Sequence, residues 1–232
     1  MGKRIIQQAR GKGSFTYRVR KRAFVFKVKY PIHEGDAMIE KIFHSAAHSA
    51  PLLKLKIGNE IFYNVAFDGA IEKEKIEIGS GKVENGNIMA LKDVPVGTNI
   101  FNIERNPGDG GKMIRAAGSH AEIHKKYDHN KVGIIMPNRK EIRLDGDCRV
   151  SIGIISGEGR KQKPFFKAGK MFHKMKARGK LYPRTSAIKV NAVDHPFGSG
   201  RGKRAKPKIA KRNAPPGAKV GHVRPRRTGR RK

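Results

Sequence analysis

The sequence has one cysteine, no tryptophan, few aromatic residues and no long apolar run. A single cysteine, Cys148, excludes an internal disulfide and fits a reducing compartment. Because no 18 consecutive residues are apolar, we expect no membrane-spanning helix. The first residues, Met1-Gly2-Lys3-Arg4, lack the apolar stretch and cleavage site of a secretory signal. We therefore expect a soluble, intracellular protein.

Acidic residues are also scarce, but only at the two ends of the chain. Residues 1–30 contain ten Lys/Arg and no acid, and residues 160–232 contain 25 Lys/Arg and one acid, Asp194. The residues between, 31–159, contain 17 basic and 18 acidic side chains. A near-neutral middle can fold without self-repulsion, whereas the ends need an external polyanion. This partition predicts a folded middle with two cationic extensions.

The ends lack the apolar residues that would let them fold alone. Fixing the backbone costs about 1–2 kcal/mol per residue, and sparse apolar side chains cannot offset that cost. We therefore expect the ends to be ordered only against a partner. Frequent helix breakers, such as Pro215-Pro216-Gly217, argue against the basic amphipathic helix that binds anionic lipid. Nucleic acid is the expected partner.

The middle of the chain shows a series of short candidate strands. Residues 52–57 turn at Gly58-Asn59 into residues 61–67, which predicts a hairpin. Such strands, spaced about 8–12 residues apart, are typical of antiparallel barrels or sandwiches. They are more numerous than one five-stranded barrel requires, so we expect an all-β fold with two small barrels in tandem. The other candidates are residues 37–43, 71–78, 88–91, 98–103, 113–117, 121–124, 132–136, 141–144 and 149–155. Only residues 168–178 show a helical pattern.

Two motifs invite a catalytic or nucleotide-binding interpretation. The loop Gly198-Ser199-Gly200-Arg201-Gly202-Lys203 departs from the phosphate-binding pattern, because Arg204 follows the lysine where Ser or Thr is needed. In Asp194-His195-Pro196 a carboxylate lies next to an imidazole, as in general-base pairs. However, sequence neighbours in extended chain point in different directions, and no nucleophile lies nearby. We expect a basic glycine loop and an RNA-contacting histidine, and no catalytic residue.

Metal binding is not expected either. The spacings His44/His48 and His120/His124 would suit a metal ion, but there is no second cysteine and no acidic partner at ligand spacing. The tract 161–174 interleaves Phe with Lys. Its aromatic residues either cap the barrel core or stack on unpaired bases while the lysines contact phosphates. The sequence leaves both interpretations open.

Several segments resemble the universal large-subunit ribosomal protein L-two family. Val94-Pro95-Val96-Gly97-Thr98 and residues 107–112 are similar to the core of that family, and residues 191–200 are similar to its signature. Residues 226–230 resemble its closing segment, and Phe197 resembles the archaeal and eukaryotic branch. Further similar segments are residues 2–5, 10–14, 115–118, 163–164, 167–170 and 173–177.

The resemblance implies an oligonucleotide-binding-type barrel followed by an SH3-like barrel. The implied parts are a basic extension (1–34), the first barrel (35–94), the second barrel (95–178) and a second basic extension (179–232). The implied function is that of a structural, non-enzymatic, cofactor-free protein that binds rRNA around the peptidyl transferase region and supports subunit association and tRNA binding. Its partners would be large-subunit rRNA, other ribosomal proteins, the small subunit across the intersubunit bridge and, indirectly, tRNA. It would act as a monomer within cytoplasmic ribosomes, without membrane contact.

The resemblance also assigns particular residues. His195, next to Asp194, matches the histidine near the peptidyl transferase region, and Arg143 matches an rRNA-contacting arginine. His48 stands where the first barrel usually has an arginine, which puts that charge contact in doubt or makes it sensitive to pH. The expected RNA-binding residues are Arg4, Arg10, Lys12, His48, Arg115, Arg143, Arg149, Lys167, Lys170, His173, Lys174, Lys176, Arg178, Arg184, His195, Arg201, Lys203, Arg204, Arg226, Arg227 and Arg230. An RNA-processing enzyme and a DNA-packaging protein are the alternatives.

Overall fold

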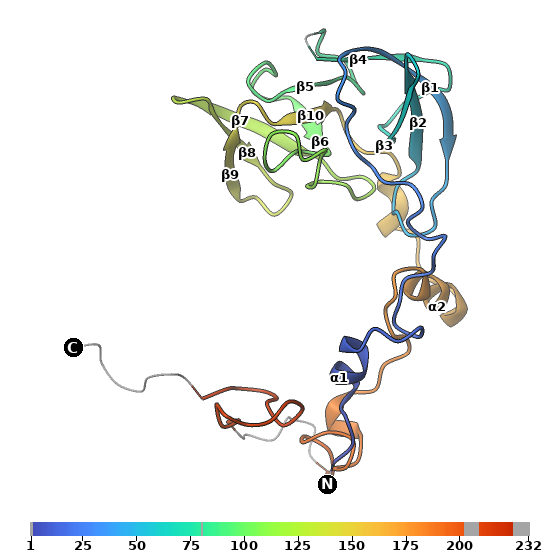
Figure 1. The fold of residues 1–232 in the computed structure, drawn as a ribbon, viewed down its shortest axis with the longest axis vertical. Coiled ribbons are helices and arrows are strands. Elements are labelled where there is room, and N and C mark those ends of the chain that lie inside the picture. The colour runs from blue at the N-terminus through green and yellow to red at the C-terminus, as the bar shows by residue number, and fades with distance from the viewer. Residues whose placement is uncertain (1, 80, 202–208, 225–232) are drawn as a thin grey trace, which may run out of the picture. The chain divides into compact units, whose positions relative to one another are not determined.

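The structure is a computed structural model that describes residues 2–79, 81–201 and 209–224. The chain divides into two compact units, which we call the β unit, Lys21–Phe166, and the basic unit, Met1–Arg20 with Lys167–Lys232 (Figure 1). Within the described ranges, none of the helices is long and apolar enough to span a membrane.

The described residues of the β unit form ten strands in one sheet, and the all-β prediction is confirmed. The strand order across the sheet is β3-β2-β1-β4-β5-β10-β6-β7-β8-β9 (Figure 1). All neighbouring strands are antiparallel except β4 and β5, which share one parallel pair, Ile78 with Ile88. The strands are β1 Gly35–Phe43, β2 Leu52–Ile57, β3 Glu60–Val65, β4 Lys75–Ile78, β5 Ile88–Ala90, β6 Asn99–Phe101, β7 Ala121–Tyr127, β8 Lys131–Ile135, β9 Glu141–Asp145 and β10 Arg149–Ile152. A short 3-10 helix, η1, follows at Glu158–Lys161.

Two hydrophobic cores lie in the β unit. The first buries side chains from β1 to β4, such as Leu55, together with Ile88 of β5 and Phe101 of β6. The second buries other side chains from β5 to β10, including Ile123. Each core follows from the alternation of apolar and polar residues, because successive side chains on a strand point to opposite faces. Two cores agree with the prediction of two small modules, and the boundary between them stays a prediction.

The sequence placed the β2–β3 hairpin correctly and the strand at residues 113–117 incorrectly. Gly58 has φ +54°, the left-handed conformation that its tight turn requires, and Ile57 pairs with Glu60. At 113–117 only Met113 pairs, as an isolated bridge with Ile103. Ile114 has φ +50°, so the chain turns there and cannot continue as a strand.

Residues 23–30 pack on the sheet, although the charge pattern placed them in an extension. Ala23 is buried, Val28 and Tyr30 are buried next to the exposed Lys27 and Lys29, and Val28 bridges to Tyr63. The Tyr30 hydroxyl donates to the Asn102 carbonyl oxygen (2.7 Å), and its oxygen lies 2.9 Å from Ser151 Oγ. Burial raises the pKa of this phenol. The segment therefore belongs to the β unit, because its alternate residues are apolar.

The described residues of the basic unit form two α-helices and one short 3-10 helix. These are α1 Ile6–Gly11, α2 Ala168–Ala177 and η2 Ala187–Lys189. The predicted basic helix is confirmed by α2, whereas α1 was not predicted. At the start of α1 the Gln8 side-chain oxygen accepts the Ile5 backbone N–H at 3.0 Å, which satisfies one free donor of the helix end. Among the described residues of this unit, only Ile5 and Gly198 are buried.

Candidate nucleic-acid interface

Positive charge gathers in the basic unit with almost no compensating acid. Its sequence contains 28 Lys/Arg and one acidic residue, Asp194, whereas the β unit contains 24 Lys/Arg and 18 acidic residues. Five ion pairs have both partners in the β unit. The cations of the basic unit therefore require an external source of negative charge.

Helix α2 presents predicted contact residues on a helix without a buried side chain. Lys167 occupies the position before the helix and Arg178 the position after it. The Phe172 ring contacts the His173 ring edge-on at 5.6 Å, and Lys176 Nζ lies 5.4 Å from the centroid of the same ring. Of the two interpretations of this tract, the exposed Phe172 favours the one in which its cations and aromatic residues face a partner. Lys170 and Lys174 belong to the same helix.

The loop around His195 is held by backbone hydrogen bonds. The Asp194 N–H donates to the Asn191 carbonyl at 3.0 Å, and the Ser199 N–H donates to the Val190 carbonyl at 3.0 Å. Gly198 closes the loop: a Cβ there would collide with the Asn191 backbone. The glycine of the signature-like segment is therefore explained by this close approach of two backbone stretches.

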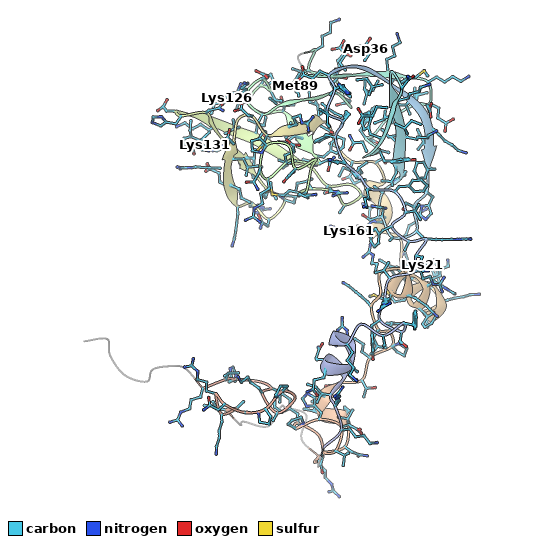
Figure 2. The ribbon with its side chains drawn as sticks, viewed as in Figure 1. Lys21, Asp36, Met89, Lys126, Lys131 and Lys161 are labelled. Atoms are coloured by element: carbon cyan, nitrogen blue, oxygen red, sulfur yellow. The ribbon has the colours of Figure 1, made fainter. Side chains whose placement is uncertain are left out.

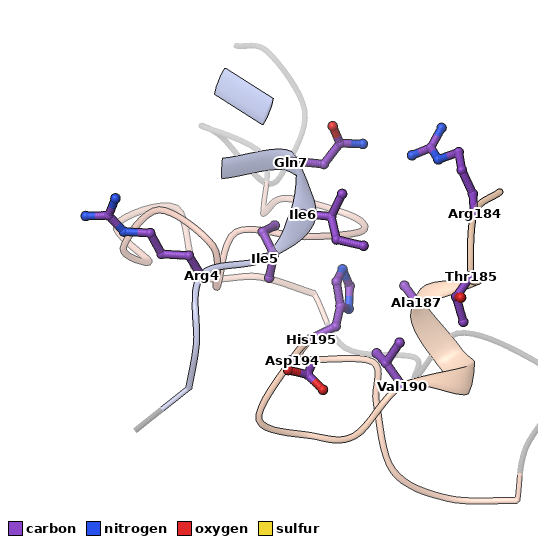
Figure 3. Close-up of a pocket in the computed structure, with 10 residues that line it drawn as sticks. All are labelled: Arg4, Ile5, Ile6, Gln7, Arg184, Thr185, Ala187, Val190, Asp194 and His195. Atoms are coloured by element: carbon purple, nitrogen blue, oxygen red, sulfur yellow. The ribbon is translucent and has the colours of Figure 1, made fainter. Parts of the chain in front are cut away.

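His195 and Asp194 are not arranged as an acid–base pair. His195 Nδ1 accepts the Phe197 backbone N–H at 3.0 Å, so this nitrogen carries no proton that an orienting carboxylate could accept. In Figure 3 the imidazole points toward α1, whereas the Asp194 carboxylate points the other way. In the neutral ring the proton lies on Nε2, which makes this atom a hydrogen-bond donor.

A pocket of about 350 Å³ lies between the amino-terminal segment and the His195 loop within the basic unit (Figure 3). Arg4 and Arg184 line it together with Ile6 and His195. The structure thus brings together three predicted contact residues that lie up to 191 positions apart in the sequence. Arg10 lies in α1, Lys12 follows it, and Arg201 is exposed at the end of the described loop.

The β unit places its predicted contact residues in three different settings. Arg143, with 64% of its side chain exposed, lies over the Tyr127 ring at 4.2 Å and can reach a partner. Arg149 instead serves the fold: Nη2 pairs with the fully buried Glu104 (3.2 Å), and Nη1 donates to the Pro31 carbonyl oxygen (2.7 Å). We therefore leave Arg149 out of the proposed interface. His48 and Arg115 line one groove.

Two surface lysines of the β7–β8 hairpin are held by internal partners. In Figure 2, Lys126 and Lys131 lie on the β7–β8 hairpin. The Lys126 ammonium donates to the Lys92 carbonyl oxygen (2.6 Å), and Lys131 pairs with Asp145 (2.8 Å). This pairing distinguishes the β unit from the basic unit, where the charge is nearly all of one sign.

No described group of three or more His, Cys, Asp or Glu residues is arranged to hold a metal ion. Cys148 is buried in the second core, and burial raises the pKa of its thiol to about 11. Five predicted contact residues lie outside the described ranges, namely Lys203, Arg204, Arg226, Arg227 and Arg230.

Comparison with known proteins identifies the family. The family model for the C-terminal domain of ribosomal proteins L2 matches residues 84–217. The large ribosomal subunit protein uL2 of Archaeoglobus fulgidus is 42% identical over 236 residues, covering 99% of each chain. The uL2 proteins of Methanothermobacter thermautotrophicus and Methanococcoides burtonii are 38% and 42% identical to this chain, and each alignment covers 100% of both chains. The chain belongs to the uL2 family.

Membership of the uL2 family confirms the resemblance on which the sequence interpretation depended. The matched region, 84–217, includes both the second core and the His195 loop, so residues 167–217 of the basic unit are part of the family's own domain. Sequence reasoning missed the groove residues Phe24, Lys27, Lys29 and Lys112. The mixed aromatic and basic composition of residues 22–29 was the available signal.

Proposed function

We propose that this chain is a structural protein of the large ribosomal subunit that binds rRNA mainly through its basic unit. The observation that carries the proposal is the charge of that unit, 28 basic residues against one acid, on a segment that buries almost none of its described residues. The names of the uL2 relatives place those proteins in the large ribosomal subunit. Its expected location is the cytoplasmic ribosome.

The proposed mechanism is electrostatic. Lysine and arginine side chains of the basic unit neutralise phosphates where rRNA helices converge, which lets like-charged RNA segments approach each other. The β unit serves as a folded anchor in which the two signs of charge are nearly balanced, with 24 basic and 18 acidic residues. The basic unit follows the uneven RNA surface, since short helices and glycine turns replace a packed core.

At finer detail, we propose that the His195 loop lies against rRNA around the peptidyl transferase region. The Nε2 N–H of His195 can donate a hydrogen bond to a phosphate or ribose oxygen. Arg4 and Arg184, which line the same pocket, can bind phosphates. By the same proposal the protein supports subunit association and tRNA binding, with other ribosomal proteins and the small subunit as neighbours. The role of His195 is to position RNA.

Salt dependence of rRNA binding tests the proposal. If about six to ten phosphates are contacted, the association constant should fall about 10³–10⁵-fold between 50 and 200 mM salt. Filter binding of the pure protein to large-subunit rRNA measures this fall. A flat response to salt would overturn the proposal.

Competition separates the proposal from a DNA-packaging function. At fixed salt, excess duplex DNA should displace rRNA poorly, because RNA loops offer unpaired bases and 2′-hydroxyls that DNA lacks. Equal displacement by both would favour DNA packaging. Incubation with labelled rRNA should give no cleavage products, since His195 Nδ1 is already engaged by Phe197. Turnover would support an RNA-processing enzyme instead.

A further inference from the structure

A groove of about 550 Å³ in the β unit joins an aromatic pair to a group of cations, and the mechanism above makes no use of it. Its volume lies within the range of about 300–1,000 Å³ typical of small-molecule sites. The Phe24 ring, 48% exposed, contacts the His48 ring edge-on with centroids 5.1 Å apart. Ser45 Oγ lies 2.8 Å from His48 Nδ1 and fixes the orientation of the imidazole.

The charge around this groove is positive. Lys27, Lys29, Lys112 and Arg115 line it, and the one acidic residue in its lining is Asp109. The Asp109 carboxylate already accepts backbone N–H groups of its own loop, from residues 105, 106 and 111. Its charge is therefore partly satisfied, and the groove attracts anions.

Two local features hold cations at the groove. The aliphatic stem of Lys29 packs where Gly110 has no side chain, because a Cβ at Gly110 would collide with Lys29 Cγ. Arg115 is half-buried, and Nη1 donates to the Gly111 carbonyl at 3.2 Å. In the described ranges no carboxylate lies within ion-pair distance of its guanidinium. A half-buried cation without a counter-ion is expected to recruit one from outside.

We propose that this groove binds a single unpaired nucleotide of the RNA, with the base stacked on Phe24 and a neighbouring phosphate bound by Arg115 and Lys112. The inference rests on the proposed function, because it takes RNA as the partner. A paired base within a helix has both faces covered by its neighbours, so only a bulged or looped base can reach the phenyl ring. An acidic peptide would use the cations, but it gives no reason for the exposed ring.

A single-nucleotide bulge provides the test. The probe is an RNA hairpin with one bulged 2-aminopurine. The control RNA is the same hairpin with a fully paired stem. The full-length protein should quench the 2-aminopurine fluorescence and bind the bulged hairpin about tenfold more tightly, in line with the stacking of one base on one aromatic ring. Phe24→Ala should abolish both effects, and Phe24→Tyr should restore them.

Matched controls separate stacking from charge and from misfolding. Ile32→Ala removes another exposed apolar side chain that does not line the groove, and it should leave the bulge preference intact. Arg115→Gln should reduce the slope of log K against log salt by about 0.7–0.9, the loss of one phosphate contact. Lys75→Gln, on strand β4 and outside the groove, should leave the slope unchanged. Circular dichroism checks that each variant is folded.

The outcomes distinguish the two proposals. Salt-dependent binding with equal affinity for both hairpins, unchanged by Phe24→Ala, would overturn the groove inference and leave the proposed function standing. A flat salt response of the wild type would overturn the proposed function and, with it, the groove inference. In assembled subunits, a photoreactive benzoylphenylalanine at position 24 should crosslink to RNA. Crosslinking to protein alone would show that a peptide occupies the groove and would also overturn the inference.

Discussion

The two units of this chain obtain order in opposite ways. In the β unit, two apolar cores and a buried ion pair between Arg149 and Glu104 define the fold. In the basic unit the described order rests on backbone hydrogen bonds, such as that from Lys3 N to the Val193 carbonyl (2.8 Å). We infer from this difference that one part of the chain encodes its own structure, whereas the other encodes affinity for a polyanion.

The same contrast explains how charge is distributed. Net charge self-repulsion destabilises a compact state, so a folded core tolerates cations best when acids pair them. The β unit meets this condition with 18 acids, and the basic unit, with one acid, does not. We infer that burial and positive charge are separated along the chain because one segment cannot maximise both.

Removing the basic unit should have the largest effect. A fragment of residues 21–166 keeps both cores but retains only six of the 33 net positive charges. We expect it to unfold cooperatively in denaturant and to bind rRNA weaker by about three orders of magnitude or more at 150 mM salt, since most phosphate contacts are lost. Filter binding and circular dichroism measure the two properties. Full affinity, or loss of the cooperative transition, would contradict the division of roles.

Glu104→Ala should have the largest effect of a single substitution on stability. The carboxylate is fully buried and accepts N–H groups from Gly108, Gly110 and Arg149. Its removal leaves the Arg149 guanidinium without its counter-ion, which should lower the free energy of unfolding by about 3–5 kcal/mol.

Denaturant unfolding of the full-length chain measures this change. Glu122→Ala, at an exposed position on β7, is the matched control and should change stability by no more than about 0.5 kcal/mol. Equal midpoints for the two variants would show that Glu104 does not hold the β unit together. The salt slope of RNA binding should be unchanged in both variants, because neither residue belongs to the proposed interface.

Local patterns predicted most of the fold, and long-range contacts account for the rest. The β2–β3 hairpin could be read from Gly58-Asn59 between two apolar runs, because turn and strands are neighbours in sequence. The network joining Tyr30 to Ser151 spans 121 positions and has no local signature. Helix α1 was missed because a six-residue helix is too short to show a period.

The candidate site divides in the same manner. Composition indicated α2 and the His195 loop, because clustered cations and a family-like signature are visible in the sequence itself. The task of Arg149 could not be foreseen, since an arginine on a strand looks the same whether it faces RNA or a buried glutamate 45 positions away. The groove at Phe24 was hidden because its lining comes from three separate stretches of the chain.

The pH dependence of stability offers the smallest and most local test of the comparison. Burial, and to a lesser degree the charge of Arg115, lowers the pKa of His48 below its ordinary value of 6.5. The folded β unit therefore disfavours the protonated imidazole, whereas the unfolded chain accepts the proton readily. Above pH 6.5 the imidazole is neutral in both the folded and the unfolded state, and the contribution of His48 to the free energy of unfolding has its full value. That contribution is lost as pH falls from 6.5 through the lowered pKa of the folded state.

His48→Gln removes this titration, so between pH 8 and pH 5 the wild type should lose more unfolding free energy than the variant. The other charged groups of the groove, Lys27, Lys29, Lys112 and Asp109, are present in both proteins, so their contributions cancel in the difference. Arg115→Gln removes only the lesser cause and should reduce the pH dependence without abolishing it. Denaturant unfolding at several pH values measures the difference. Parallel curves for wild type and His48→Gln would show that His48 is as well solvated in the folded β unit as in the unfolded chain. The groove would then not desolvate its imidazole, and at this residue the β unit would be as open to solvent as the basic unit.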